Sequence, residues 1–180
     1  MKKRIIALGL LWCLSAVMLQ AARVDTVLVR SAAMNKDVKV VYVLPDKAIG
    51  KQACPVVYLL HGYGGNAKTW IGVKPDLPQI ADEKGIIFVC PDGKNSWYWD
   101  SPLRPESQFE TFVARELTAW IDSRYPTIKD RKGRAITGLS MGGHGSLWLS
   151  FRHKDLFGAA GSTSGGVDIR PFPQSWGMSN

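Results

Sequence analysis

The chain has 180 residues, of which 46% are hydrophobic and 21% are charged, and its formal net charge is +8. This composition is typical of one folded domain with a hydrophobic core, and it excludes a disordered chain. The basic residues at 129–134 are interrupted by an aspartate and a glycine and form no long run. The charge therefore does not indicate a nucleic-acid partner.

The segment 1–22 has the pattern of a signal peptide. Basic residues at 2–4 precede an apolar run at 5–18, and alanines follow at 21–22. The apolar run is shorter than the ~20 residues that a membrane-spanning helix needs. We therefore expect cleavage near residue 22, export to the periplasm or the outside of the cell, and a mature chain 23–180 that has net charge +5 and no stable membrane anchor.

Two kinds of strand pattern follow the predicted signal peptide. The segments 24–30 and 37–44 alternate apolar and polar residues, which predicts an antiparallel hairpin at one edge of a sheet. The segments 56–60 and 86–90 are unbroken apolar runs bounded by glycine and proline. Such runs predict strands that helices bury on both faces.

Helical and strand patterns then alternate along the rest of the chain. Apolar residues at helical spacing predict helices over 77–83 and 106–124, and a third helix is expected over 142–153. Short apolar segments predict strands over 134–139 and 157–162. The order of elements predicts an α/β fold with a mostly parallel sheet and helices on both faces.

Two cysteines, Cys54 and Cys90, lie in the predicted mature chain. Cys54 begins one apolar strand and Cys90 ends another, so in parallel neighbouring strands their sulfur atoms would be ~16 Å apart. We expect both to be unpaired, buried and apolar in role.

A glycine-flanked serine carries the strongest chemical signal. Gly138, Ser140 and Gly142 have the spacing of a nucleophile elbow, in which a strained strand-to-helix turn exposes the serine hydroxyl. Only small flanking residues allow so tight a turn, and the dipole of the following helix points at the serine. A predicted strand before the motif and a predicted helix after it supply the required context.

A second glycine-rich segment, 61–65 (HGYGG), directly follows the predicted strand 56–60. Acyl transfer needs backbone N–H donors where the oxyanion forms, and this loop can bring one such donor close to the serine. We predict that the amides of Tyr63 and Met141 form the oxyanion hole. The alternative is an ordinary turn at the end of a strand.

The two motifs occur with PDG at 91–93, NSWYWD at 95–100 and FGAAGS at 157–162. Together they resemble the esterase D and feruloyl esterase branch of the α/β hydrolases over about residues 36–170. Many relatives carry threonine where this chain has Trp99, so no single relative defines the substrate preference.

The resemblance implies an α/β-hydrolase fold, with Ser140 as the catalytic nucleophile and Tyr63 and Met141 as oxyanion donors. It also implies a catalytic Asp and His after two strands that follow Ser162, which would lie beyond Asn180. On this basis the chain is expected to be the N-terminal two-thirds of the fold without its last strands, and to be weak or inactive alone.

The three histidines are His61, His144 and His153. A catalytic base must reach the serine hydroxyl and be oriented by a third group. His153 is at the far end of the helix after Ser140, His144 is expected to pack beside the sheet, and His61 belongs to the HGYGG loop. We predict a structural role for each.

Aromatic residues at Trp97, Tyr98 and Trp99 are expected at the carboxyl edge of the sheet, where they would suit an aryl ester or a sugar ring. Packing of the loop is the alternative. Carboxylates such as Asp92 and Glu110 are predicted to lie on the surface or in loops. The spacing of Cys, His and Asp indicates no metal site, and no cofactor is expected.

These observations predict a serine ester hydrolase that acts on carbohydrate-linked acyl or feruloyl esters through an acyl-enzyme. The alternatives are a sugar acyltransferase and a non-catalytic carbohydrate-binding protein. The expected partner is a small-molecule or polysaccharide ester, and the oligomeric state is left open.

Overall fold

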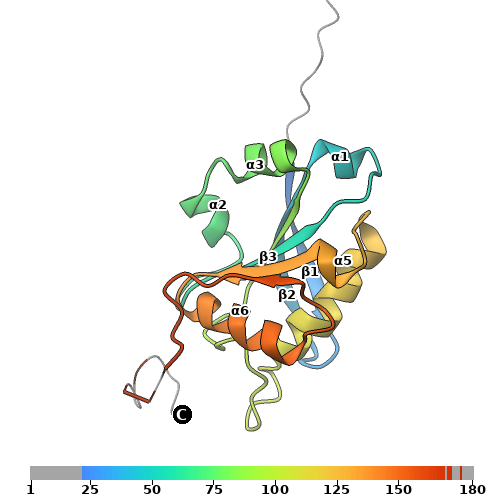
Figure 1. Cartoon of the computed structure of the whole chain (residues 1–180). Helices are drawn as coiled ribbons and strands as arrows, with labels where there is room; N and C mark the ends of the chain where they lie inside the picture. The colour runs from blue at the N-terminus through green and yellow to red at the C-terminus, as the bar shows by residue number, and fades with distance from the viewer. Residues whose placement is uncertain (1–21, 169, 172–174, 176–180) are drawn as a thin grey trace, which may run out of the picture.

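The computed structural model describes residues 22–168, 170–171 and 175, so the predicted signal peptide lies outside the described residues except for Ala22. These residues form a six-stranded sheet with the order β1-β2-β4-β3-β5-β6 (Figure 1). The strands are β1 (Arg23–Ser31), β2 (Lys36–Leu44), β3 (Val56–Leu60), β4 (Ile87–Pro91), β5 (Arg134–Gly138) and β6 (Ala159–Ala160).

The sheet is mixed, as the sequence predicts. β1 and β2 form the expected antiparallel edge hairpin, with Arg23 opposite Leu44, and β2 also pairs antiparallel with β4. The remaining strands are parallel, and Leu60 at the end of β3 lies opposite Gly138 at the end of β5. This register places the two glycine-rich motifs side by side at the carboxyl ends of the parallel strands.

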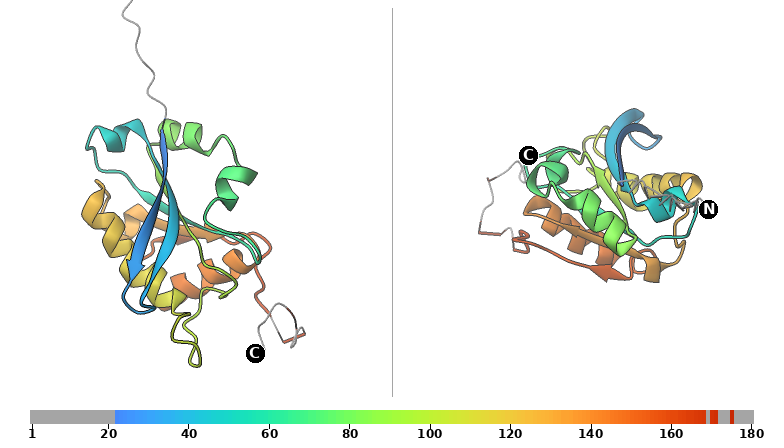
Figure 2. Two further views of the ribbon diagram at one scale, coloured as in Figure 1. Left: turned by 180° about the vertical axis from the view of Figure 1, so that it is seen from behind. Right: turned by 90° about the horizontal axis from the view of Figure 1, so that it is seen from above.

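Helices cover both faces of the sheet (Figure 2). They are α1 (Asp46–Ile49), α2 (Thr69–Val73), α3 (Leu77–Lys84), α4 (Phe109–Thr111), a π-helical turn (Phe112–Leu117), α5 (Thr118–Arg124), a 3₁₀ turn (Arg131–Gly133) and α6 (Met141–Arg152). The sequence predicts neither α1 nor α2, which are short. α3 and α6 lie where the helices 77–83 and 142–153 are expected.

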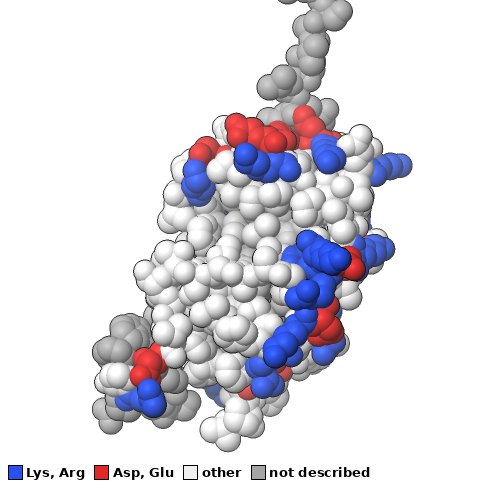
Figure 3. Space-filling model, viewed as in Figure 1, with Lys and Arg blue, Asp and Glu red and all other residues white. Residues whose placement is uncertain are grey.

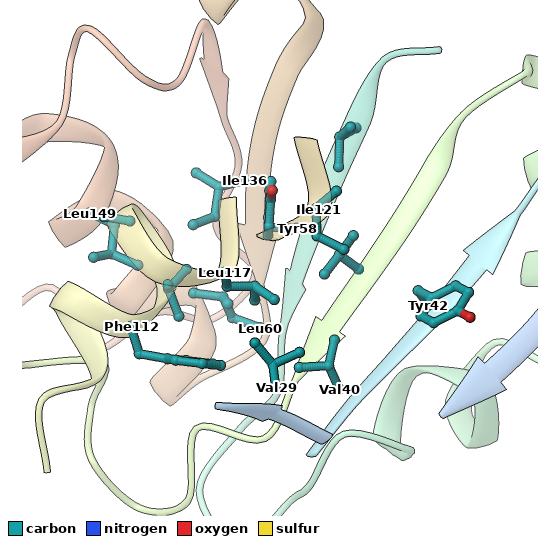
Figure 4. Close-up of a cluster of buried hydrophobic side chains, with 14 of the residues drawn as sticks. Val29, Val40, Tyr42, Tyr58, Leu60, Phe112, Leu117, Ile121, Ile136 and Leu149 are labelled. Carbon is teal, nitrogen blue, oxygen red and sulfur yellow. The ribbon is translucent and has the colours of Figure 1, made fainter. Parts of the chain in front are cut away.

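Each face of the sheet has its own apolar core. On one face the π-helical turn, α5 and α6 pack on alternate strand residues such as Val40, Tyr58 and Ile136 (Figure 4). On the other face α3 packs on Val41 and Phe88. Alternate residues of one strand therefore enter opposite cores, which explains the unbroken apolar runs in the sequence.

Two predicted elements differ from the structure. The predicted helix 106–124 begins only at Phe109 and contains the π-helical turn, in which the Thr118 hydroxyl donates to the carbonyls of Ala114 and Arg115. The predicted strand 157–162 is reduced to β6, and the only other pairing there is a bridge between Leu139 and Thr163. Glycines on both sides of β6 weaken its propensity to extend as a strand.

The prediction for the cysteines is confirmed. Cys54 and Cys90 are both unpaired and fully buried, and they belong to the cores on opposite faces of the sheet. Burial raises the pKa of the Cys90 thiol to about 12, which keeps it protonated.

Two features of the described residues bear on partners. No helix in this part of the chain is long and apolar enough to cross a membrane, and no cluster of His, Cys, Asp and Glu is placed to hold a metal ion. Figure 3 shows charged side chains near the α1 and α3 end and along one side of the molecule, with a mainly uncharged surface between them.

Candidate active site

Ser140 occupies the strained turn between β5 and α6. Its backbone has φ 54° and ψ −116°, a conformation that residues with a side chain rarely adopt, and the residue is exposed. A Cβ atom on Gly138 would lie 2.3 Å from the backbone of Gly142, and one on Gly142 would lie 2.2 Å from the carbonyl oxygen of Leu60. The two glycines of the motif are therefore required by close backbone approach.

The HGYGG loop lies directly against this turn. A Cβ atom on Gly62 would be 3.5 Å from the Cβ of Ser140. Within the described residues, the backbone amides of Tyr63 and Met141 donate to no acceptor, and Met141 is the first residue of α6. Tyr63 directly follows Gly62 and Met141 directly follows Ser140, so both amides belong to the two segments that meet at this turn.

His61 fixes the position of this loop. Its buried ring accepts a hydrogen bond from the Gly93 amide at Nε2 (2.9 Å) and lies 2.7 Å from the Gly62 carbonyl oxygen at Nδ1. Because Nε2 accepts, Nδ1 carries the proton and donates it to Gly62. Both ring nitrogens are therefore occupied within the scaffold, as the predicted structural role requires.

Asp92 lies next to His61 in the loop that follows β4, which is one of the two predicted locations, but it is not on the surface because only 5% of it is exposed. Its carboxylate accepts from the amide and the ammonium group of Lys94, and one oxygen is 3.6 Å from His61 Nε2. Burial opposes ionisation, but the ammonium and amide groups of Lys94 outweigh it and hold the pKa of Asp92 below its usual range. Asp92 therefore remains a carboxylate that anchors the start of the following loop.

The aromatic loop, residues 95–100, leaves the carboxyl end of β4. Trp97 and Tyr98 have φ of 57° and 61°, which is unusual for large side chains. The Tyr98 ring is fully buried between Gly93 and Gly145, and its hydroxyl donates to the carbonyl of His61 at 3.2 Å. Tyr98 thus packs inside the protein and presents no surface to a substrate.

Trp97 and Trp99 line a hollow of about 230 Å³ in the surface. Asn95 also lines it and accepts a hydrogen bond from the Gly64 amide at 2.8 Å. The hollow therefore adjoins the HGYGG loop. The sequence motif did not reveal this role of Asn95, because the contact joins two loops that are 31 positions apart.

His144 packs against the aromatic loop and not beside the sheet as predicted. Its Nε2 accepts from the indole N–H of Trp99 at 3.0 Å, and its Nδ1 lies 2.7 Å from the carbonyl oxygen of Gly166. The ring also contacts Trp97 and Trp148. Burial lowers the pKa of His144, so the neutral ring with its proton on Nδ1 is favoured.

The prediction of a surface or loop location for Glu110 is wrong, since the residue lies in α4 and is only 7% exposed. Its carboxylate accepts from the side chains of Trp148 and Arg152 and lies 3.0 Å from His153 Nε2. Burial opposes its ionisation, but these partners outweigh burial and lower the pKa of Glu110. The cluster ties α4 to α6, and it accounts for the third histidine.

A mixed sheet covered on both faces, with a serine on the turn between a parallel strand and its helix, defines an α/β-hydrolase fold. The chain belongs to the Esterase family ("Putative esterase"), whose sequence model matches residues 31–180.

Several characterised proteins are similar to this chain in sequence. An acetyl esterase of Caldicellulosiruptor saccharolyticus is 30% identical over 136 residues, which is 71% of this chain and 50% of that protein. An endo-1,4-beta-xylanase/feruloyl esterase of Xylanibacter ruminicola is 35% identical over 127 residues, which is 66% of this chain and 18% of that protein. The chain thus spans half or less of the length of these relatives.

Solved structures agree with the fold. A ferulic acid esterase superposes with a TM-score of 0.73 and 31% identity, covering 86% of this chain and 64% of that one. The fluorophosphonate-binding serine hydrolase FphF of Staphylococcus aureus superposes with a TM-score of 0.78 at 18% identity, covering 86% and 62% of the two chains, and so shows the fold alone.

Proposed function

We propose that this chain carries the nucleophile and the oxyanion hole of a serine ester hydrolase. The observation that carries the proposal is the strained backbone of the exposed Ser140 at the start of α6, with Gly62 packed against it. Membership of the Esterase family supports ester hydrolysis as the reaction.

In the proposed reaction, Ser140 Oγ attacks the ester carbonyl carbon while a base removes the hydroxyl proton. The amides of Tyr63 and Met141 donate to the oxyanion of the tetrahedral intermediate. The alcohol then leaves with that proton. In the second half of the reaction water attacks the acyl-enzyme carbonyl, the base takes the proton of the water, and Ser140 leaves with it. The dipole of the twelve-residue α6 adds to the stabilisation of the oxyanion.

The proposal requires a base from outside the described residues. All three histidines of the chain are hydrogen-bonded to other groups, and their partners are Gly62 and Gly93 for His61, Gly166 and Trp99 for His144, and Glu110 for His153. We therefore infer that the catalytic Asp and His come from a segment beyond those described here, and that this chain alone is weak or inactive.

The hollow beside Trp97 and Trp99 supports an aromatic acyl group or a sugar ring as the part of the substrate that binds there. Relatives named as feruloyl esterase and acetyl esterase favour carbohydrate-linked acyl esters. Product analysis with and without an added sugar acceptor distinguishes hydrolysis from acyl transfer. Binding of a sugar without any acylation of Ser140 would instead favour a carbohydrate-binding protein.

The test of the nucleophile uses the whole protein that carries this chain. Ser140→Ala is expected to lower hydrolysis of a short aryl ester at least about a thousandfold and to abolish labelling by a fluorophosphonate probe. Ser150→Ala is the matched control, because Ser150 lies on the same helix and its hydroxyl donates only to Leu147. Retention of more than a tenth of the activity by Ser140→Ala would remove Ser140 from this role.

We also propose that the protein is exported and that residues 1–22 are removed. The basic, apolar and small-residue order of this segment supports the proposal. N-terminal sequencing of the protein recovered outside the cytoplasm is expected to begin near residue 23, and recovery of an intact Met1 from the cytoplasm would contradict it.

A further inference from the structure

Three segments of the chain meet at the side chain of His144. The residue lies on the first turn of α6, where its amide donates to the carbonyl of Ser140 at 2.9 Å. Its ring accepts from Trp99 of the aromatic loop and donates to Gly166. The nucleophile turn, the aromatic loop and the segment 163–166 are thus joined through one imidazole.

The segment 163–166 is itself part of the surroundings of the nucleophile. The Ser140 amide donates to the carbonyl of Thr163 at 2.8 Å, and a Cβ atom on Gly165 would lie 2.9 Å from the amide nitrogen of His144. Displacement of the His144 ring would therefore disturb both segments that contact Ser140, namely α6 and the segment 163–166.

The aromatic loop needs such an external support. Trp97 and Tyr98 both have positive φ, a conformation that persists only where surrounding contacts hold it. The ring of Trp99 is 5.2 Å from the His144 ring between centroids, and the ring of Trp97 is 5.4 Å from it. The two indoles that line the 230 Å³ hollow thus both rest on this imidazole.

We propose that His144 is a positioning residue that determines substrate specificity, because its neutral ring fixes Trp97 and Trp99 as the wall of the substrate pocket. The inference rests on the proposed function, since it names how the hollow that adjoins the HGYGG loop is held. Neutral imidazole can accept from Trp99 and donate to Gly166 at once, whereas the protonated ring can only donate. Protonation therefore removes the acceptor of the Trp99 indole.

The charged groups near His144 are paired with other residues, so burial is the main determinant of the pKa of His144. On the loops, Asp100 is hydrogen-bonded to Thr111, and Asp168 is bonded to Arg170. On α6, Arg152 pairs with Glu110. The Trp148 ring stacks on the His144 imidazole and lies between the imidazole and Arg152. Loss of the Trp99 contact is thus expected only as the pH falls below the ordinary histidine value of about 6.5.

The experiment compares variants of the whole protein on a small acetyl ester and on a bulky aromatic acyl ester. His144→Ala is expected to lower the ratio of kcat/KM for the bulky ester to that for the acetyl ester at least about tenfold, because the aromatic wall is misplaced. His144→Gln, which can accept and donate at any pH, is expected to restore the ratio near neutral pH.

The pH profile separates positioning from packing. In the parent, the ratio of kcat/KM for the bulky ester to that for the acetyl ester is expected to decrease when the pH is lowered below about 6.5. This decrease should be absent in His144→Gln, and also in Trp99→Phe, which lacks the indole N–H. Trp120→Phe, a tryptophan on α5 outside this cluster, is the matched control and should keep the decrease. An unchanged profile in His144→Gln would overturn the proposal, even if His144→Ala fails to fold.

A second measurement needs no catalysis, so it distinguishes failure of this inference from failure of the proposed function. Tryptophan fluorescence of the Ser140→Ala protein is followed from pH 8 to 4.5, where imidazolium formation beside Trp99 should quench the emission. The transition should disappear in the Ser140→Ala protein that also carries His144→Gln. A fluorescence transition that persists in this double variant would have to come from another titratable group, and it would overturn the proposal.

Discussion

Tyr98 and Gly145 show how a single missing side chain shapes the site. The Tyr98 ring lies so close to α6 that a Cβ atom on Gly145 would be 2.5 Å from its Cδ2 atom. The tyrosine in turn supports the HGYGG loop through its hydroxyl bond to the carbonyl of His61. A small residue on the helix therefore allows a large one to fill the space under the aromatic loop.

Gly145→Ala is expected to lower the free energy of unfolding by about 1–3 kcal/mol, because the new methyl group meets the base of the Tyr98 ring and not a mobile end. Denaturant unfolding of the whole protein measures the change. Gly72→Ala is the matched control, since Gly72 lies in helix α2 with open space at its Cβ position. It is expected to raise stability by about 0.4–1 kcal/mol, and equal losses in both variants would contradict the packing argument.

The sequence predicts residues whose roles depend on local spacing. The spacing predicts Ser140 and the following Met141 because one glycine on each side of a tight turn is a short-range requirement, and the structure shows this strained turn with Gly62 packed against it. The bonds of His61 to Gly93 and of Trp99 to His144 join positions 32 and 45 residues apart. No local pattern in one sequence encodes such contacts, and burial of Tyr98 was missed for the same reason.

At the scale of elements, a buried ion pair joins α5 to β5. Arg134 is 5% exposed and donates to Asp122 at 2.6 Å, while its second terminal nitrogen donates to the carbonyl of Leu156. Asp122 also accepts from Thr127. The pair thus fixes the helix before β5 and the turn after α6 around the start of β5, the strand that leads to the Ser140 turn.

Asp122→Ala is expected to destabilise the protein by about 3–5 kcal/mol, because it leaves the Arg134 guanidinium buried without its counter-charge. Thermal or denaturant unfolding measures the loss. Asp76→Ala removes the acid of the exposed pair with Lys74 and should cause no measurable change. A small effect of Asp122→Ala would mean that water replaces the carboxylate at Arg134.

Three of the strands in this chain were easier to predict than its short or irregular helices. The unbroken apolar run of β3 and the alternation in β1 and β2 are direct consequences of burial on two faces or one, and their predicted bounds are within one residue of the observed ones. The π-helical turn adds a residue to one helical turn, which an average helical period does not detect. α1 and α2 contain only four and five residues, too few to show a period.

At the scale of the whole molecule, β6 is the last strand of the sheet among the described residues. It has two residues, both exposed, and pairs only with β5. The surface between the charged regions in Figure 3 is mainly uncharged. An open strand edge on such a surface can pair with another chain.

The isolated segment 23–180 is therefore expected to associate in solution, with a mass above that of the monomer in light scattering. Ala160→Lys on β6 should reduce association, because a charge on an edge strand opposes pairing. Ala32→Lys, in the exposed turn after β1, is the matched control and should leave association unchanged. A monomer at all concentrations would contradict the importance of this edge.

The same segment is expected to turn over p-nitrophenyl acetate only slowly, because oxyanion stabilisation without a base gives a small part of the catalysis of a complete triad. Measured turnover of the whole protein is the control. Normal turnover by residues 23–180 would mean that His61 or His144 leaves its observed partners and acts as the base.

The sheet order also affects how the chain folds during translation. β3 lies between β4 and β5, and β5 is synthesised about 75 residues after β3 ends. At roughly 5–20 residues per second, the nascent chain spends several seconds with one edge of this wholly apolar strand unpaired. The HGYGG loop is therefore synthesised well before β5, the second parallel partner of β3, and during that interval the unpaired apolar edge of β3 is open to association with other chains.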